Sequence, residues 1–308
     1  GGSPLAQYLN ELGQYIGHCV VVCSGNEGNE RLHYSGALND GKNDEVEIRV
    51  GENDKGFVLE LWGNTPDLFS VSFVSPLGET VERIPARKDV SKKVNFLLED
   101  TTIEVDYSLV EAGGGRELIF MRFIKPTPGL WTIRVYGSNI VNGRFNIWAN
   151  IRKFVNAETY FLKPNPHITL TIPSDAQNVI NVSGYDNFTE AIYPNSGRGF
   201  TNDNNIKPDV AAPAVNVYGA DIGRSAELSG GFIRKNGTSI AAALAGGCCA
   251  QMLQWGFVNG NDIYMKGTYI KSYLIRGAQR NRNITYPNVQ WGYGKLDVFN
   301  SFLILTRT

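Results

Sequence analysis

An excess of charge of either sign is what this sequence lacks most clearly. It contains 29 Lys and Arg against 30 Asp and Glu in 308 residues, which gives a net charge of −1. Proteins that bind nucleic acids hold the phosphates with a dense basic surface, and no block of Lys and Arg of that density occurs. We therefore expect no nucleic-acid partner. The hydrophobic share of 42% and the charged share of 19% are typical of a globular protein and exclude a disordered chain.

Long hydrophobic runs are also missing. No apolar stretch of about 18 residues, the length at which a bilayer span is expected, is present. We therefore expect no membrane partner. The first residues, Gly1 to Pro4, have neither the charged start nor the apolar core of a secretory signal. We expect the chain to begin inside a longer protein.

Cysteine is scarce, with Cys19, Cys23, Cys248 and Cys249 as its four occurrences. They lie in the most apolar segments and lack the regular spacing of a disulfide framework, so we expect buried thiols. A zinc site is the alternative. It is disfavoured because Cys19 and Cys23 share a strand-like run and no cluster of Cys and His joins them. We expect neither a metal nor another cofactor.

The first 38 residues have the texture of an α/β domain. Apolar positions between residues 3 and 17 recur at helical spacing, and an uninterrupted apolar run follows at 19–23. Such a strand is typical of a parallel sheet covered on both faces, whose ligands bind beyond the carboxyl ends of the strands. The turn that contains Asn26 lies at that end.

Residues 39–155 have a different texture. Short runs of alternating apolar and polar residues are separated by Gly, Pro, Asn and Asp, which predicts an antiparallel sandwich or jelly roll of about eight strands. Trp62, Trp131 and Trp148 could form a carbohydrate platform, but large aromatic residues in a sandwich more often belong to its core. The predicted strands are 46–50, 57–62, 69–74, 94–98, 103–107, 118–123, 131–136 and 145–151.

The α/β texture returns after residue 155. A strand is expected at 178–182, and helices are expected at 239–253 and at about 262–275. The sequence therefore predicts one α/β domain, made of residues 1–38 and 156–308, with a β-sandwich domain, residues 39–155, inserted into it.

One serine stands at a chemically useful position. Ser239 follows Gly237 and Thr238 and opens an apolar helix, where free N–H groups and the positive end of the helix dipole can stabilise an oxyanion. The alternative is a serine that only caps the N-terminus of a core helix. On this segment alone, the capping role is favoured.

Together with four other segments, the serine segment resembles the subtilisin-like serine proteases (subtilases). Residues 20–28, Val-Val-Val-Cys-Ser-Gly-Asn-Glu-Gly, are similar to the family strand that ends in Gly-Asn-Glu-Gly, and 207–213, Lys-Pro-Asp-Val-Ala-Ala-Pro, to its Pro-Asp segment. Residues 236–247 are similar to the serine segment, and 178–182 and 292–298 to the next strand and the closing Gly-x-Gly segment. The resemblance covers about residues 1–38 and 156–304. It implies an α/β fold: a partial subtilisin-like parallel-sheet domain interrupted by an all-β jelly-roll insertion.

The resemblance also implies an activity and the residues that carry it. A subtilase is a serine endopeptidase that hydrolyses peptide bonds through an acyl-enzyme, here on Ser239. Asn26 would supply the side-chain donor of the oxyanion hole. We expect the polypeptide substrate to lie as an extended strand against Ser24 and Gly25.

The sequence departs from the family pattern at two points. Ala243 and Leu244 stand where most subtilases have Pro-His, which leaves the nucleophile in place. The Asp and His segments of the catalytic triad, which come before the Asn in the family, are missing, because only 25 residues precede Asn26.

None of the three histidines is a convincing replacement. His18 is expected at the wrong end of its strand, His167 stands in a Pro-rich linker, and His33 has no family motif around it. Without a general base, the hydroxyl of Ser239 is a poor nucleophile. We therefore expect this chain alone to be inactive, and we expect its partner to be the missing N-terminal part of the same protein.

The inserted domain indicates which branch of the subtilase family the chain resembles. A jelly roll between the oxyanion strand and the next strand resembles the clostridial Csp subtilases, which act in spore germination by cleaving the precursor of a cortex hydrolase. This favours the cytoplasm or the spore over secretion. Some members of that branch have lost triad residues, so the alternative is a pseudoprotease whose jelly-roll domain binds a protein or a carbohydrate. The retained Ser239 and Asn26 favour an active parent.

Overall fold

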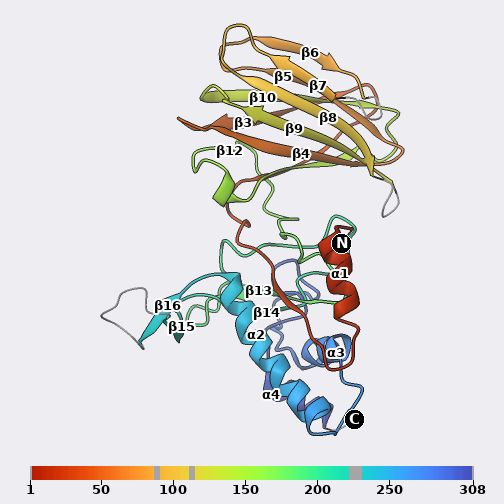
Figure 1. Ribbon diagram of the computed structural model, residues 1–308, viewed down its shortest axis with the longest axis vertical. Helices are drawn as coiled ribbons and strands as arrows, with labels where there is room; N and C mark the ends of the chain where they lie inside the picture. The colour runs from red at the N-terminus through yellow and green to blue at the C-terminus, as the bar shows by residue number, and fades with distance from the viewer. Residues whose placement is uncertain (1, 87–90, 111–114, 222–230, 307–308) are drawn as a thin grey trace. The chain divides into compact units, whose positions relative to one another are not determined.

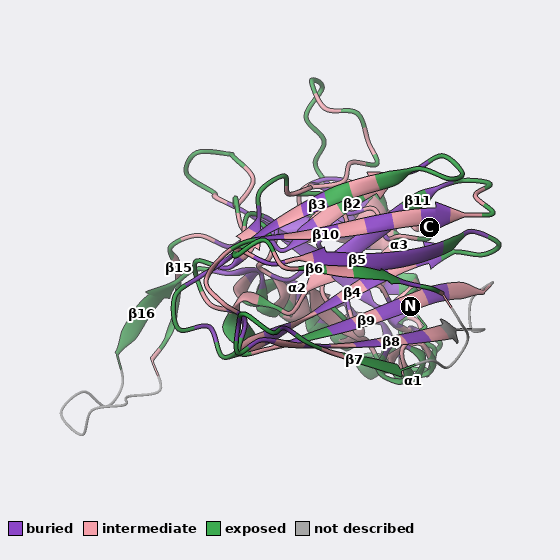
Figure 2. Ribbon diagram, turned by 90° about the horizontal axis from the view of Figure 1, so that it is seen from above, coloured by how far each residue is buried: buried purple, intermediate pink, exposed green. Residues whose placement is uncertain are grey.

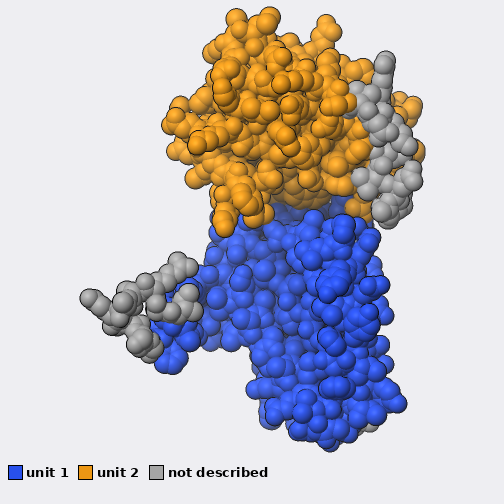
Figure 3. Space-filling view, in the orientation of Figure 1, with its two compact units in different colours: residues 1–29, 167–308 blue, residues 30–166 orange. Residues whose placement is uncertain are grey.

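The computed structural model describes residues 2–86, 91–110, 115–221 and 231–306. It divides into two compact units, which Figure 3 colours separately. Unit 1 comprises Gly1–Asn29 and His167–Thr308, and unit 2 comprises Glu30–Pro166. Unit 2 is wider than the predicted insertion of 39–155, because two short strands at its ends, β2 (His33–Ala37) and β12 (Tyr160–Phe161), pair into its sheets.

Unit 1 is built on a parallel sheet of three strands. β1 (Val21–Cys23), β13 (Ile180–Tyr185) and β14 (Val210–Pro213) lie in the order β1-β13-β14, and both neighbouring pairs are parallel. β13 is buried at every position, as a parallel strand with two covered faces should be. The whole of unit 2 lies in the chain between β1 and β13, so the predicted α/β fold with a β insertion is confirmed.

Four helices complete the described part of unit 1 (Figure 1). α1 (Pro4–Leu12) is capped by the hydroxyl of Ser3, which accepts a hydrogen bond from the Ala6 N–H. α2 (Thr238–Leu253) packs on all three strands and continues into a π-helical turn, Gln254–Val258. α3 (Gly267–Gly277) and α4 (Val298–Leu305) pack on each other.

α2 is less buried than its apolar sequence predicts. The helix is apolar on every side, which indicates a fully buried helix, but only one stripe of it is buried, including Ala241, Ala245 and Cys249. On another side Leu244 is 40% exposed. No described residue covers that side.

Residues 238–258 are long and apolar enough to cross a membrane when length and composition alone are considered. Core helices of soluble proteins also pass this test.

A buried charged cluster fixes the start of β14 to β13. The Asp209 carboxylate accepts hydrogen bonds from the Asn181 N–H at 2.7 Å and the Lys207 Nζ at 2.7 Å, and it lies 3.0 Å from the Lys271 Nζ. Burial lowers the pKa of Lys207 to about 8, against the opposing effect of Asp209. The Pro-Asp segment therefore anchors the sheet through its carboxylate.

A short hairpin also belongs to unit 1. β15 (Val217–Ala220) and β16 (Phe232–Lys235) pair with each other and with no other described strand. β16 ends four residues before Ser239.

Unit 2 is an antiparallel sandwich of one five-stranded and one six-stranded sheet. The strand orders are β12-β3-β10-β5-β6 and β2-β11-β4-β9-β8-β7. In Figure 2, buried and partly buried residues alternate along many of these strands, and Trp131 is fully buried in the core between the two sheets. A 3-10 turn, Arg152–Phe154, follows the last long strand. The remaining strands are β3 (Asn43–Val50), β4 (Gly56–Asn64), β5 (Leu68–Val74), β6 (Thr80–Ile84), β7 (Ser91–Asn95), β8 (Thr102–Val110), β9 (Arg116–Ile124), β10 (Gly129–Ser138) and β11 (Arg144–Ala149).

Candidate active site

Ser239 lies in the first turn of α2 with its side chain exposed. The N-cap residue of the helix is Gly237, with a φ of +134° that a side chain would rarely tolerate, and the N-cap makes no side-chain hydrogen bond. The capping alternative for Ser239 is therefore wrong, because the serine is inside the helix. Its backbone N–H finds no acceptor among the described residues, as is usual for the first turn.

The side chain of Asn26 lies against the start of the same helix. Its Oδ1 accepts a hydrogen bond from the Thr238 N–H at 3.0 Å and lies 3.2 Å from the Thr238 Oγ1. Since a backbone N–H can only donate, the amide atom that faces it must be the oxygen. The Nδ2 of Asn26 therefore points elsewhere, and within the described ranges it has no hydrogen-bond acceptor.

The structure thus brings together two residues that are 213 positions apart in sequence. Asn26 touches Thr238, the residue directly before Ser239, and a Cβ added to Gly237 would lie 3.8 Å from the Asn26 Nδ2. Two N–H donors, those of Asn26 and Ser239, thereby have no acceptor among the described residues. Donors of this kind can stabilise a developing oxyanion when they face the same atom.

Ser24 and Gly25, the predicted substrate-binding residues, make main-chain contacts with neighbouring segments. Ser24 is fully buried, its N–H donates to the Val182 carbonyl, and its carbonyl accepts from Thr171. The Gly25 carbonyl accepts from the Gly197 N–H and from the Thr238 hydroxyl. Three of the four main-chain N–H and C=O groups of these residues are thus paired with neighbouring segments, and pairing of a substrate strand with them stays a prediction.

Gly25 is required by the geometry of the turn. Its φ is +91°, and a Cβ at this position would lie 2.5 Å from the Oγ1 of Thr171. A residue with a side chain would therefore displace the turn that carries Asn26.

Two site residues were not predicted. The Sγ of Cys23, the last residue of β1, lies 3.9 Å from the Oγ of Ser239. Thr238 links Asn26 to the helix, and the sequence feature that could have identified it is its position between Gly237 and Ser239. The feature that could have identified Cys23 is its place at the carboxyl end of the strand that leads to Asn26.

The four thiols are less buried than expected. Cys249 is buried, and Cys19, Cys23 and Cys248 are half-buried.

Neither of the two histidines of unit 1, His18 and His167, is hydrogen-bonded to Ser239 within the part of the chain that the structure describes. His18 precedes β1, at the strand end away from Asn26, and its Nδ1 bonds to the Ile16 carbonyl. His33 is buried in unit 2, where its two ring nitrogens lie 3.0 Å from the Asn165 carbonyl and the Asn146 Oδ1. Partial burial and the neighbouring Arg198 lower the pKa of His167.

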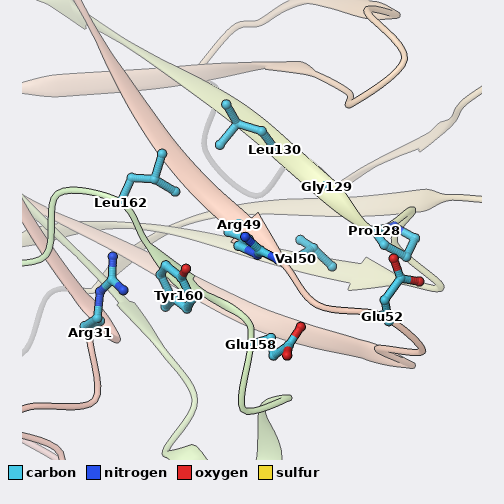
Figure 4. Close-up of a pocket in the computed structure, with 10 residues that line it drawn as sticks. All are labelled: Arg31, Arg49, Val50, Glu52, Pro128, Gly129, Leu130, Glu158, Tyr160 and Leu162. Carbon is cyan, nitrogen blue, oxygen red and sulfur yellow. The ribbon is translucent and has the colours of Figure 1, made fainter.

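A shallow groove of about 490 Å³ lies on the outer face of the five-stranded sheet of unit 2 (Figure 4). Tyr160, Arg49 and Leu130 stand directly opposite one another on three adjacent strands. The guanidinium of Arg31 lies 3.7 Å above the Tyr160 ring. Glu52 and Glu158 also line the groove, which therefore carries charges of both signs.

Comparisons with known proteins point to one protein family. Residues 146–294 match the subtilase family, Peptidase_S8. The structure of the Clostridium perfringens CspB protease is similar to all of this chain, with 30% identity and a TM-score of 0.90, and the match covers 63% of that protein. The chain thus spans less than two thirds of the length of that protease.

Other solved structures match smaller parts of the chain. The prenylagaramide maturation protease PagA is similar over 44% of this chain and 46% of its own, with 22% identity and a TM-score of 0.36. The patellamide maturation protease PatA is similar over 46% of this chain and 48% of its own, with 22% identity and a TM-score of 0.38. No curated protein matches the chain at a significant level.

Proposed function

Since the chain belongs to the subtilase family, we propose that it carries the nucleophile and the oxyanion hole of a serine endopeptidase. The hydroxyl of Ser239 attacks the carbonyl carbon of the scissile peptide bond and gives up its proton to a base, which forms a tetrahedral intermediate. The C–N bond of this intermediate then breaks, the amine leaves with that proton, and an acyl-enzyme remains on the Ser239 Oγ. The observation that carries the proposal is the contact of Asn26 with Thr238, which holds the carboxamide beside Ser239.

The oxyanion hole follows from the two unused donors. As the carbonyl becomes tetrahedral, its oxygen takes up negative charge, which the Ser239 N–H and the Asn26 Nδ2 stabilise as hydrogen-bond donors. Asn26 need not reorganise during the reaction, since Thr238 already holds its oxygen. Preorganised donors of this kind are often the largest contribution to such catalysis.

The base that takes the proton of Ser239 is proposed to come from outside this chain. The chain spans 63% of the length of the CspB protease, and a His and an Asp in the remaining part of the parent protein would complete the triad. In the chain alone the hydroxyl keeps its proton, so we expect it to be inactive.

We propose the same N-terminal part as the partner of α2. The helix exposes Ala243, Leu244 and Ala250 on the side away from the sheet, although it is apolar throughout. An apolar helix face that stays in water is unfavourable, and a partner that covers it gains the burial free energy.

A fluorophosphonate probe tests the nucleophile. The full-length protein should be labelled on the peptide that contains Ser239, the labelling should disappear in Ser239→Ala, and Ser272→Ala should be labelled as the wild type is. A folded full-length protein that is not labelled would refute the endopeptidase.

A second candidate function is that of a pseudoprotease whose sandwich binds a protein or a carbohydrate. The groove beside Arg31, Arg49 and Tyr160 favours it, because an aromatic ring with an adjacent guanidinium is a common surface for planar or anionic ligand groups. Absence of labelling together with binding that is lost in Tyr160→Ala would support this reading.

A role in spore germination is proposed from the resemblance to the clostridial Csp subtilases. The polypeptide substrate would then be the precursor of a cortex hydrolase. Accumulation of the unprocessed precursor in spores that carry Ser239→Ala would support this role, and normal processing would contradict it.

A further inference from the structure

The β15–β16 hairpin exposes an aromatic face to solvent. Its register places Tyr218 opposite Arg234 and Ala220 opposite Phe232, so these four side chains share one face. Tyr218 is 62% exposed and Phe232 is 75% exposed. Figures 1 and 2 show the hairpin projecting from the body of unit 1.

The residues on this face are already arranged as a recognition surface. The rings of Tyr218 and Phe232 lie 6.2 Å apart at 38°, and the guanidinium of Arg234 lies 4.9 Å from the centre of the Tyr218 ring. Arg234 has no carboxylate partner among the residues that the structure describes. The face therefore offers an apolar surface next to a positive charge that no carboxylate of the described residues pairs with.

A two-stranded hairpin with an exposed aromatic face has little stability of its own in water, and a partner that covers the face would stabilise it. Two strands that pair only with each other are marginally stable in water, and neither of these pairs with a strand of the parallel sheet. Both strands also keep an open edge whose N–H and C=O groups can pair with an added strand.

The base of the hairpin is fixed beside the nucleophile. The Gly237 N–H donates to the Ala214 carbonyl at 2.8 Å, and the Asn216 N–H donates to the Asn236 Oδ1 at 2.6 Å. Ser239 follows directly after this base. The aromatic face lies within about 25 Å of chain from the nucleophile, which an extended polypeptide spans with roughly five to seven residues.

We propose, on the premise of the endopeptidase function, that this face is an exosite for the polypeptide substrate. A substrate segment several residues away from the scissile bond places an apolar side chain against Tyr218 and Phe232 and a carboxylate against Arg234. We assign the substrate to this face because only four residues of chain separate Arg234, at the edge of the face, from Ser239.

The test compares a short and a long substrate of the full-length protein. The Tyr218→Ser/Phe232→Ser variant should hydrolyse a tetrapeptide p-nitroanilide within twofold of the wild-type rate, because that substrate is too short to reach the hairpin. Its kcat/KM for an acidic unfolded protein, reduced and alkylated α-lactalbumin, should fall about tenfold, mainly through KM. The matched control is Phe299→Ser, which removes a ring that is 69% exposed on α4 and should change neither rate.

The charge is tested separately. Arg234→Gln should lower kcat/KM for the unfolded protein and should weaken its dependence on salt, because screening acts on the pairing of Arg234 with a carboxylate.

Each outcome decides between the two claims. If the hairpin variants cleave both substrates as the wild type does, the exosite is wrong and the endopeptidase stands. An equal loss on both substrates also overturns the exosite, since the hairpin would then only support the active site. A wild-type protein that cleaves neither substrate refutes the endopeptidase and, with it, the exosite.

Discussion

At the scale of single residues, the orientation of one side-chain amide decides what the site can do. Thr238 donates its N–H to the Asn26 Oδ1, which leaves the Nδ2 for a ligand. A substitution that removes this amide should therefore reduce the stabilisation of the transition state more than it reduces the affinity for the substrate.

For Asn26→Ala in the full-length protein, we expect kcat to fall by about 10²–10³ with little change in KM, the loss known for the corresponding donor of subtilisin. Steady-state kinetics on a peptide p-nitroanilide measure it. Asn259→Ala, which changes an exposed amide after the π-helical turn, should have no effect. A loss that appears in KM alone would contradict the role of Asn26.

Thr238→Val tests the support of that amide. It keeps the shape of the side chain and the backbone N–H, but it removes the hydroxyl that lies 3.0 Å from the Gly25 carbonyl. We expect kcat to fall by about tenfold, the value of one buried hydrogen bond. Thr238→Ser, which keeps the hydroxyl, should restore most of the rate, and equal rates in the two variants would refute this role.

The sequence could single out Ser239 and Asn26 as candidates, because each stands in a short segment whose residue types are required by its conformation. Gly25 and Gly237 have positive φ angles in these segments. It could not show that Ser24 is buried or that the Gly25 carbonyl is occupied, since those contacts come from Thr171 and Gly197, far away in the chain.

At the scale of elements, strands with alternating apolar and polar residues that end in clear turns could be predicted. Strands without a clear alternation could not. β6 (Thr80–Ile84) is mostly exposed at the edge of its sheet, and β12 has two residues, so neither carries a run of alternating apolar residues. β2 contains a glycine among polar residues. The fully exposed strand β16 has no buried side to reveal it.

Two strands of the sandwich are linked by a buried carboxylate. Glu117 of β9 is 5% exposed, and its Oε2 accepts a hydrogen bond from the Phe69 N–H of β5 at 2.6 Å. Burial, together with the nearby Asp67, raises the pKa of Glu117 to about 7, against the lowering effect of the Phe69 N–H.

The pH dependence of the sandwich follows from this shift. The folded state holds the Glu117 proton more tightly than the unfolded state, whose pKa is near 4.5. The stabilising contribution is complete below that value and is lost as the pH rises through about 7.

Glu117→Gln should therefore stabilise unit 2 by about 1–2 kcal/mol at pH 8 and by almost nothing at pH 4. The amide oxygen still accepts from Phe69 but carries no charge. Hydrogen exchange of the β9 amides, corrected for intrinsic rates, measures the difference, and Glu82→Gln on exposed β6 is the control. A stabilisation that does not depend on pH would contradict this account.

At the scale of the whole molecule, the two-part organisation could be predicted because the hydrophobic period changes from helical to alternating and back. The boundaries at 39 and 155 could not, since β2 and β12 join unit 2 through pairings with β11 and β3. The exposure of one side of α2 could not be predicted either. The apolar sequence of a helix indicates that the helix is buried, but it does not indicate which segment or partner buries each side.

The uncovered side of α2 gives a prediction about assembly. Leu244→Glu places a charge on the exposed side without touching the sheet, and it should abolish copurification with the separately expressed N-terminal part of the parent protein. Tyr269→Glu, an exposed position on α3, should leave copurification intact. If Leu244→Glu still binds that part, the partner does not cover α2.

The central claim is that the Ser239 hydroxyl and the Asn26 carboxamide act on the same carbonyl group. A crystal structure of the full-length protein after reaction with diisopropyl fluorophosphate tests it most directly. The account predicts phosphorus bonded to the Ser239 Oγ, with the phosphoryl oxygen within hydrogen-bond distance of the Asn26 Nδ2 and the Ser239 N–H. An adduct on another residue, or a phosphoryl oxygen that points away from Asn26, would contradict it.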